Sequence, residues 1–136
     1  FDRVWVVFDK DDFVDFNEAI QLAASYSFQS AWTNEAFELW YFLHFQYLDA
    51  GISRHDYIEK LQSEIRKHPG YENYEYKKND ASVYKMLTTI GNEDLAKRYA
   101  ERLRSFFEGD EDYKEHKPCT TVDLLVSELE SPEKLL

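Results

Sequence analysis

Apolar and polar positions divide the start of the chain into a strand, a helix and a second strand. Residues 4–8 form an unbroken apolar run, which is typical of a strand buried on both faces of a parallel sheet. Apolar residues then recur at helical spacing over residues 16–24, and residues 28–33 alternate large and small side chains. This order predicts a βαβ unit with a right-handed crossover. Because a buried parallel strand needs neighbours, we expect further sequence before Phe1.

The pattern that follows is helical. Residues 35–48 are apolar on almost every side, which predicts a buried helix with Asn34 as its cap. Shorter amphipathic patterns predict further helices over residues 53–68, 82–90 and 92–106 and from residue 122 onward. The helix starts are marked by candidate capping residues: Ser53 with Asp56, Asn92, and Thr120 with Asp123.

These elements predict an α/β protein with a small parallel-sheet core and a predominantly helical second half. A length of 136 residues fits a single domain. We divide that domain into an α/β core over residues 1–50 and a helical lobe over residues 51–136.

The chain is strongly acidic and has one cysteine. Sixteen Lys plus Arg against 27 Asp plus Glu give a formal charge of −11, which argues against broad, salt-dependent adhesion to nucleic acid. Contact with DNA or RNA would need a local basic patch or a bound cation. A single cysteine cannot form an intrachain disulfide and fits a reducing cytoplasm. No apolar run approaches the roughly 20 residues of a membrane span, so we expect a cytoplasmic protein without a membrane contact.

Two acidic residues, Asp9 and Asp11, follow directly after the first predicted strand. Open α/β sheets place their sites at the carboxyl ends of strands. At a spacing of two in an extended segment, both carboxylates can turn toward one point, where two like charges repel unless a cation lies between them. Mg²⁺ takes a few carboxylates together with water and phosphate oxygens. The pair therefore indicates either a Mg²⁺ site or a solvated acidic turn that caps the next helix.

Glu38 lies in an almost wholly apolar stretch, so we expect its carboxylate to be partly buried and to need a partner. One interpretation is that it orients a water molecule or a ligand of the Asp9–Asp11 pair. The other is that it bonds only to backbone or to a core tyrosine. His44, on the same predicted helix, is interpreted as a core histidine.

Residues 117–121 precede the last predicted helix. A proline ahead of a capping threonine fixes a helix start, where free N–H groups can bind an anion. Lys117, Thr120 and Thr121 could together hold a phosphate; the alternative is an ordinary capped helix without a ligand. Cys119 has no histidine at a spacing that would make it a nucleophile.

Three blocks of sequence, in this order, resemble the RloB-like family: residues 2–11, residues 34–45 and residues 118–126. The middle block carries Asn34 and the Phe37-Glu38-Leu39-Trp40 stretch. The fold of that family resembles Toprim, the metal-dependent phosphoryl-transfer domain of topoisomerases, primases and related nucleases. Its members are associated with bacterial phage-defence loci, often beside an ABC-type ATPase. The resemblance therefore implies a Toprim-like parallel-sheet core.

Carried over residue by residue, the resemblance makes Asp9 and Asp11 the Asp-x-Asp pair that binds Mg²⁺ (or Mn²⁺). It matches Glu38 and Asn34 to polar positions of the family's Asn-x-x-Phe-Glu-x-Trp block. We expect Glu38 to act in catalysis beside that pair, and Asn34 and Asp12 to support the centre.

The resemblance also matches Thr120 and Thr121 to the late Pro-x-Ser/Thr-Thr block of the family. The chain departs from the family at Glu35, where a proline is usual, and at Lys117, where an asparagine is usual. Neither departure touches the acidic pair. The Toprim glutamate belongs before the Asp-x-Asp strand, so we expect it upstream of Phe1, in a longer protein of which this chain is the carboxyl-terminal part.

The resulting expectation is a Mg²⁺-dependent nuclease domain of a phage-defence (abortive infection) system, with DNA or RNA as substrate and an ABC-type ATPase as partner. The alternative is a non-catalytic partner or sensor module that binds an ATPase or a nucleic-acid end through the tyrosine-rich segment at residues 71–79 and the helical lobe. The sequence leaves open whether the chain forms a homodimer.

Overall fold

The computed structural model describes residues 3–11 and 13–131. Its first three elements are β1 (Trp5–Asp9), α1 (Phe16–Ser25) and β2 (Gln29–Asn34). The two strands pair in parallel, from Trp5 opposite Gln29 to Asp9 opposite Thr33. The predicted α/β class and the strand–helix–strand order are confirmed.

A third strand completes the sheet from the far end of the chain. β3 (Cys119–Thr120) pairs antiparallel with β2, and the strand order is β1-β2-β3. The sheet is therefore mixed, not purely parallel, and it uses residues beyond the predicted core boundary at residue 50. Among the described residues β1 pairs with β2 alone, and Val7 is 53% exposed. The prediction that this strand is buried on both faces is therefore wrong for the described part of the chain.

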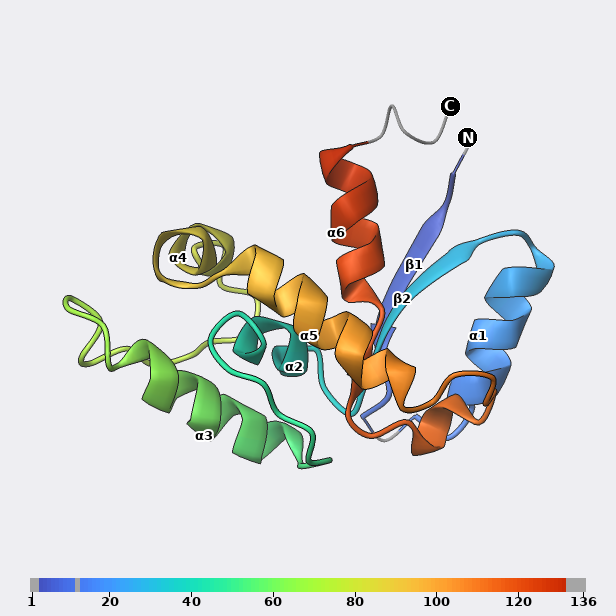
Figure 1. Ribbon diagram of the computed structural model, residues 1–136, viewed down its shortest axis with the longest axis horizontal. Coiled ribbons are helices and arrows are strands. Elements are labelled where there is room, and N and C mark those ends of the chain that lie inside the picture. The colour runs from blue at the N-terminus through green and yellow to red at the C-terminus, as the bar shows by residue number, and fades with distance from the viewer. Residues whose placement is uncertain (1–2, 12, 132–136) are drawn as a thin grey trace.

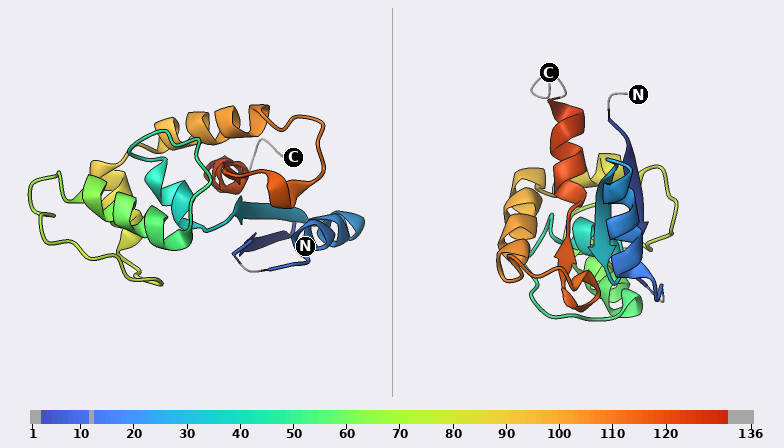
Figure 2. Two further views of the ribbon diagram at one scale, coloured as in Figure 1. Left: turned by 90° about the horizontal axis from the view of Figure 1, so that it is seen from below. Right: turned by 90° about the vertical axis from the view of Figure 1, so that its right-hand side faces the viewer.

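Helices cover both faces of the sheet (Figure 1; Figure 2). α1 packs on one face, where the rings of Phe16 and Trp32 meet edge to face with centroids 5.5 Å apart. α5 (Glu93–Ser105) and α6 (Val122–Glu130) lie on the other face. β2 serves both layers because side chains alternate along a strand: Trp32 packs with α1, and Ala31 belongs to the core on the opposite face.

A helical part extends beside the sheet. α3 (Arg54–Ile65) and α4 (Val83–Ile90) precede α5 in the chain. α3 and α4 share a small core made of Leu61, Ile65, Val83, Met86 and Leu87. Two predicted N-caps are confirmed: the Ser53 side chain accepts from the Asp56 N–H, and the Asn92 side chain accepts from the Leu95 N–H.

The predicted helix over residues 35–48 is wrong in length. α2 spans Glu38–Phe42, and Asn34 ends β2 instead of capping a helix. The Asp11 N–H donates to the Glu35 carbonyl at 2.6 Å, so backbone pairing continues beyond the ends of β1 and β2 and keeps this segment out of a helix. The apolar pattern correctly indicated burial, but burial alone does not set the length of a helix.

The predicted capping box of Thr120 and Asp123 is also wrong. Thr120 lies in β3, with its hydroxyl 2.8 Å from the hydroxyl of Thr33. The buried carboxylate of Asp123 accepts two hydrogen bonds from Arg104, at 2.5 and 2.8 Å. Thr120 also accepts locally from the Val122 N–H at 3.2 Å, but Thr121 is the residue that precedes α6. The other partners of Thr120 and Asp123 lie far away in the chain, where a local sequence pattern does not reveal them.

His44 is a core histidine, as predicted. It is buried, its Nδ1 donates to the Trp40 carbonyl at 2.9 Å, and its ring packs against Trp40 with centroids 4.9 Å apart. Burial lowers the pKa of His44, although hydrogen bonds to the Trp40 and Tyr41 carbonyls oppose the shift. The native protein therefore favours the neutral imidazole.

This burial predicts a pH-dependent stability. The unfolded chain takes up a proton on His44 at a higher pH than the native protein does, so the free energy of unfolding falls as the pH drops below about 6.5. We expect urea titrations at about pH 7.5 and 5.5 to show this fall, and His44→Gln to reduce it. His55→Gln is the matched control, because that side chain is 78% exposed. An unchanged pH dependence in His44→Gln would contradict the prediction.

Candidate functional site

Asp9 and Asp11 lie at the carboxyl end of β1. Asp9 is the last residue of the strand, opposite Thr33. The chain turns just after it, and Asp11 has a φ of 42°, a left-handed conformation that aspartate adopts more readily than most residues. This turn brings both carboxylates to the edge of the sheet where the sequence predicts a site.

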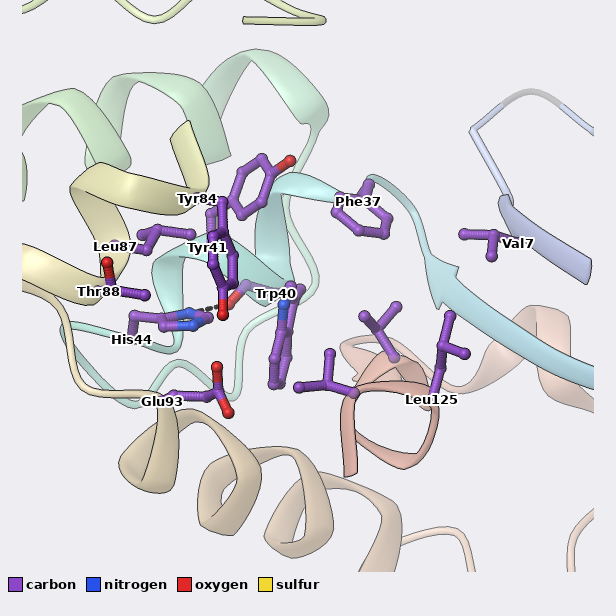
Figure 3. Close-up of a pocket in the computed structure, with 12 residues that line it drawn as sticks. Val7, Phe37, Trp40, Tyr41, His44, Tyr84, Leu87, Thr88, Glu93 and Leu125 are labelled. Atoms are coloured by element: carbon purple, nitrogen blue, oxygen red, sulfur yellow. Dashed lines mark hydrogen bonds between the residues drawn. The ribbon is translucent and has the colours of Figure 1, made fainter. Parts of the chain in front are cut away.

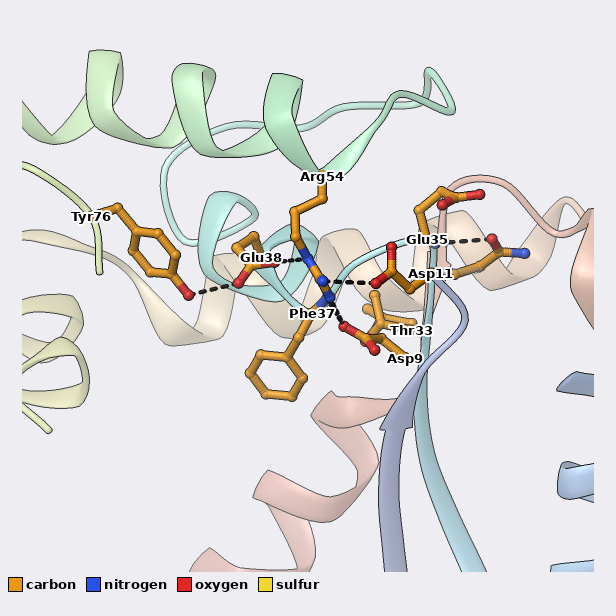
Figure 4. Close-up of polar contacts among 10 residues, drawn as sticks. Asp9, Asp11, Thr33, Glu35, Phe37, Glu38, Arg54 and Tyr76 are labelled. Carbon is orange, nitrogen blue, oxygen red and sulfur yellow. Dashed lines mark hydrogen bonds and ion pairs between the residues drawn. The ribbon is translucent and has the colours of Figure 1, made fainter. Parts of the chain in front are cut away.

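The two carboxylates meet that of Glu38 around the guanidinium of Arg54 (Figure 4). Arg54 Nη1 donates to Asp11 Oδ2 at 2.9 Å, and Nε donates to Glu38 Oε1 at 3.1 Å. Arg54 Nη2 donates to Asp9 Oδ2. These side chains come from three places, the end of β1, the start of α2 and the start of α3. One planar cation therefore joins three elements at the edge of the sheet. We call these four residues the acidic cluster.

Glu38 is 2% exposed, and each of its carboxylate oxygens has a partner. Oε1 accepts from Arg54, and Oε2 accepts from the Tyr76 hydroxyl at 2.6 Å. Burial and this bond to a negative charge raise the pKa of Tyr76, so its hydroxyl keeps its proton. The prediction of a buried carboxylate that needs a partner is confirmed, while its catalytic role stays a prediction.

Negative charge exceeds positive charge in the acidic cluster. Three carboxylates around one guanidinium leave a formal charge of −2. Burial acts to lower the pKa of Arg54, but the charges of Asp9, Glu38 and Asp11 outweigh it and raise that pKa above its ordinary value. Arg54 is therefore permanently charged, and the cluster as a whole attracts further cations.

A cleft of about 180 Å³ opens beside the acidic cluster. Its lining includes Asp9, Glu38 and Tyr76 from the cluster and its partner, and Lys78 and Asn79 from the connection between α3 and α4. Two of the carboxylates therefore border the same cleft as a lysine.

The carboxylates of the acidic cluster have the chemistry of metal ligands. Carboxylate oxygens are the ligands that Mg²⁺ prefers, and Mg²⁺ takes one or two of them together with water and substrate phosphates. Asp9 and Asp11 supply two. Within residues 3–11 and 13–131, however, no group of three or more His, Cys, Asp or Glu side chains is arranged to hold a metal ion. The carboxylates are instead arranged around the guanidinium of Arg54.

Asn34, one of the two predicted supporting residues, lies away from the acidic cluster. Asn34 is buried; its Nδ2 donates at 2.9 Å to two carbonyls of the short 3₁₀ helix η1 (Tyr113–Glu115), and its Oδ1 accepts from the Glu35 N–H. These bonds join the end of β2 to η1 and do not reach the acidic cluster. Asp12 lies outside the described residues.

The residues predicted to hold a phosphate make contacts within the protein. The hydroxyl of Thr120 bonds to that of Thr33, and the hydroxyl of Thr121 bonds to the backbone of β2. Lys117 Nζ lies 3.2 Å from Glu35 Oε1. These contacts give the two threonines a structural role, and phosphate binding by the three residues stays a prediction.

Cys119 lies next to these threonines in β3 and is 1% exposed. Burial raises the pKa of its thiol to about 12, although the positive charge of Arg104 opposes the shift. The thiol is therefore protonated at neutral pH, which agrees with the expectation that it is not a nucleophile.

Two residues of the site were missed in the sequence. Arg54 is the first residue of α3, where the positive end of the helix dipole disfavours a cation by about 0.3–1 kcal/mol. A basic residue at the start of a predicted helix therefore predicts acidic partners nearby, but the sequence does not show which acidic residues these are. Tyr76 lies in a tyrosine-rich connection that shows neither helix nor strand periodicity, and nothing in the sequence links Tyr76 to Glu38.

A second cavity, of about 240 Å³, shares Phe37 and Tyr41 with the lining of this cleft, and its own lining is mainly apolar (Figure 3). Trp40 and His44 line it together with Leu125 of α6 and Val7 of β1. Its hydrocarbon lining distinguishes it from the charged cleft beside the acidic cluster.

Parallel strands, helices on both faces and carboxylates gathered at the carboxyl end of β1 define an α/β protein with an acidic centre at the edge of its sheet. The family model described as RloB-like protein matches residues 1–129, and the chain belongs to that family. This confirms the family resemblance seen in the sequence. No curated protein and no solved structure is similar enough to the chain to count as a match. In the described part of the chain, the helices are too short or too polar to cross a membrane.

Proposed function

We propose that this chain carries the metal-binding centre of a Mg²⁺-dependent nuclease that cleaves phosphodiester bonds of DNA or RNA in bacterial phage defence. The observation that carries the proposal is the convergence of Asp9, Asp11 and Glu38 on one cation at the carboxyl end of β1. Membership of the RloB-like family supports it. An ABC-type ATPase partner belongs to the same proposal and rests on the family resemblance.

In this proposal each residue of the site has a distinct task. Asp9 and Asp11 hold Mg²⁺ or Mn²⁺, which when bound neutralises charge on the phosphate and on the leaving oxygen. Glu38, fixed by Tyr76, orients the attacking water. Lys78 at the cleft attracts a phosphate of the substrate. Such local attraction is needed because the chain as a whole, at −11, repels nucleic acid.

The test is metal binding and cleavage in the full-length protein. Asp9→Asn and Asp11→Asn remove one negative charge each and keep the shape of the side chain. We expect each to weaken Mn²⁺ binding, followed by electron paramagnetic resonance, by about tenfold or more, because Mg²⁺-type sites depend on one or two carboxylates. Mg²⁺-dependent cleavage of DNA and RNA oligonucleotides should fall in parallel.

Asp49→Asn is the matched control, because it makes the same charge change at an exposed residue outside the acidic cluster. It should leave both Mn²⁺ affinity and cleavage close to those of the wild type. Undiminished Mg²⁺-dependent cleavage by both Asp9→Asn and Asp11→Asn would overturn the proposed mechanism.

A second candidate function is a non-catalytic partner or sensor module. The bonds from Arg54 to all three carboxylates favour it, because acidic side chains with a purely structural role would also be held by a cation of the protein. The same titration separates the two functions. A nuclease centre binds Mn²⁺ through Asp9 and Asp11, so Asp9→Asn weakens the binding. In a module whose acidic cluster is structural, Asp9→Asn leaves any Mn²⁺ binding unchanged.

A further inference from the structure

Arg54 lies where the proposed metal ion would bind. Its guanidinium donates to oxygens of Asp9, Asp11 and Glu38. We propose that Arg54 is an internal counter-ion of the acidic cluster, which a divalent cation displaces and which then binds a phosphate of the substrate. This inference rests on the proposed function, because it requires the cation to bind through Asp9 and Asp11.

The first step of the argument is competition for the same oxygens. Asp9 Oδ2 and Asp11 Oδ2 are both bonded to Arg54. A divalent cation bound to these carboxylates would lie next to the guanidinium, and two positive charges that close repel strongly at a partly buried site. Binding of the cation therefore requires the guanidinium to move away.

The second step is that the three carboxylates hold the Arg54 guanidinium in place, although the dipole of α3 opposes a cation there. Arg54 begins α3, where the helix dipole disfavours a cation. Its side chain is 24% exposed, so it has a path toward solvent. Once a metal ion neutralises Asp9 and Asp11, the attraction that offsets the dipole is largely lost. Glu38 keeps a partner in Tyr76 when Arg54 leaves.

The third step is the change of charge at the site. The acidic cluster has a formal charge of −2, which repels a phosphate. A bound divalent cation leaves the three carboxylates and the ion with a formal charge of −1, which the displaced guanidinium beside them balances. That planar group is then free to bind phosphate through two parallel hydrogen bonds. The cleft beside Asp9 and Glu38, with Lys78 in its lining, is where the guanidinium meets the phosphate. Metal binding therefore turns a centre that repels the substrate into one that attracts it.

The first experiment measures Mn²⁺ affinity in the full-length protein by electron paramagnetic resonance. Arg54→Gln is expected to bind Mn²⁺ about tenfold more tightly than the wild type, because the ion no longer displaces a cation. Arg98→Gln removes the same charge from an exposed position on α5 and should stay within about twofold of the wild type. Adding Asp9→Asn to Arg54→Gln should abolish the gain.

The outcomes separate this inference from the proposed function. If the wild type binds Mn²⁺ and Arg54→Gln binds it no more tightly than Arg98→Gln does, the displacement is overturned. The proposed function is not affected by that result. If neither the wild type nor Arg54→Gln binds Mn²⁺, the proposed function fails and this inference fails with it.

A second measurement uses the wild-type fold and does not depend on the stability of Arg54→Gln. The Nε–H resonance of Arg54 is assigned in ¹⁵N-labelled full-length protein by its absence from Arg54→Lys. We expect Mg²⁺ to move it toward the position of a free arginine, and an unchanged resonance at saturating Mg²⁺ would overturn the displacement. For the phosphate contact, Arg54→Gln should raise the KM of oligonucleotide cleavage by about tenfold at saturating Mn²⁺. An unchanged KM would overturn that contact.

Discussion

Replacing Arg104 by methionine is expected to lower the free energy of unfolding by about 3–5 kcal/mol. Arg104 donates to both carboxylate oxygens of the buried Asp123 and, at 2.8 Å, to the Thr120 carbonyl. Methionine fills much of the same space but leaves Asp123 as a buried charge without its partner. Urea unfolding followed by circular dichroism measures the loss.

The effect should be large because this pair attaches β3 and α6 to α5. Arg98→Met on the same helix is the control, and we expect it to change stability by less than about 0.5 kcal/mol. Replacing both members of the pair, by Arg104→Met with Asp123→Leu, should recover most of the loss, because no buried charge remains. A loss below about 1 kcal/mol in Arg104→Met would show that Asp123 finds another partner.

Replacing Trp40 by alanine is expected to cost about 3–5 kcal/mol as well. Trp40 is 5% exposed and belongs to the core formed by β2, α2, α3, α5 and α6. Its ring also borders the cavity of about 240 Å³ (Figure 3). Removing the indole enlarges an existing void, and the helices around it can close that void only in part.

Urea unfolding at neutral pH measures this second effect too. Leu129→Ala on α6 is the control: its side chain is 70% exposed, so the change should stay within about 0.5 kcal/mol. The free energy of unfolding of Trp40→Phe should lie between those of Trp40→Ala and Leu129→Ala, since Phe keeps an aromatic ring in the core. A stability of Trp40→Ala close to that of the control would mean that Trp40 contributes little to this core.

The parts of the fold that were predicted correctly depend on neighbours in sequence. The caps at Ser53 and Asn92 each bond to an N–H three residues ahead, and the βαβ unit follows from the order of its apolar patterns. The position of Asp9 and Asp11 at the end of a strand was predictable for the same reason. Such features are encoded within one short window.

The parts that were missed depend on contacts between distant residues. β3 has two residues, and its pairing joins Thr120 to Thr33, so no periodic pattern could indicate it. For the acidic turn at Asp11 the sequence offers a metal ion or solvent as partner, and it does not indicate Arg54, 43 positions later, with which the structure pairs it. A sequence gives the charge of each residue, but the fold decides which charges meet.

The burial of Cys119, the one cysteine of this 136-residue chain, makes its reaction with thiol reagents a measure of how often the sheet opens. Thiol reagents attack the thiolate, and with a pKa of about 12 and 1% exposure the native thiol offers almost none. Labelling must therefore wait until β3 leaves β2, an opening that also releases the Thr33–Thr120 contact. The rate of labelling therefore reports how often β3 separates from β2, and it can be measured without substitutions while metal ions or nucleic acids are added.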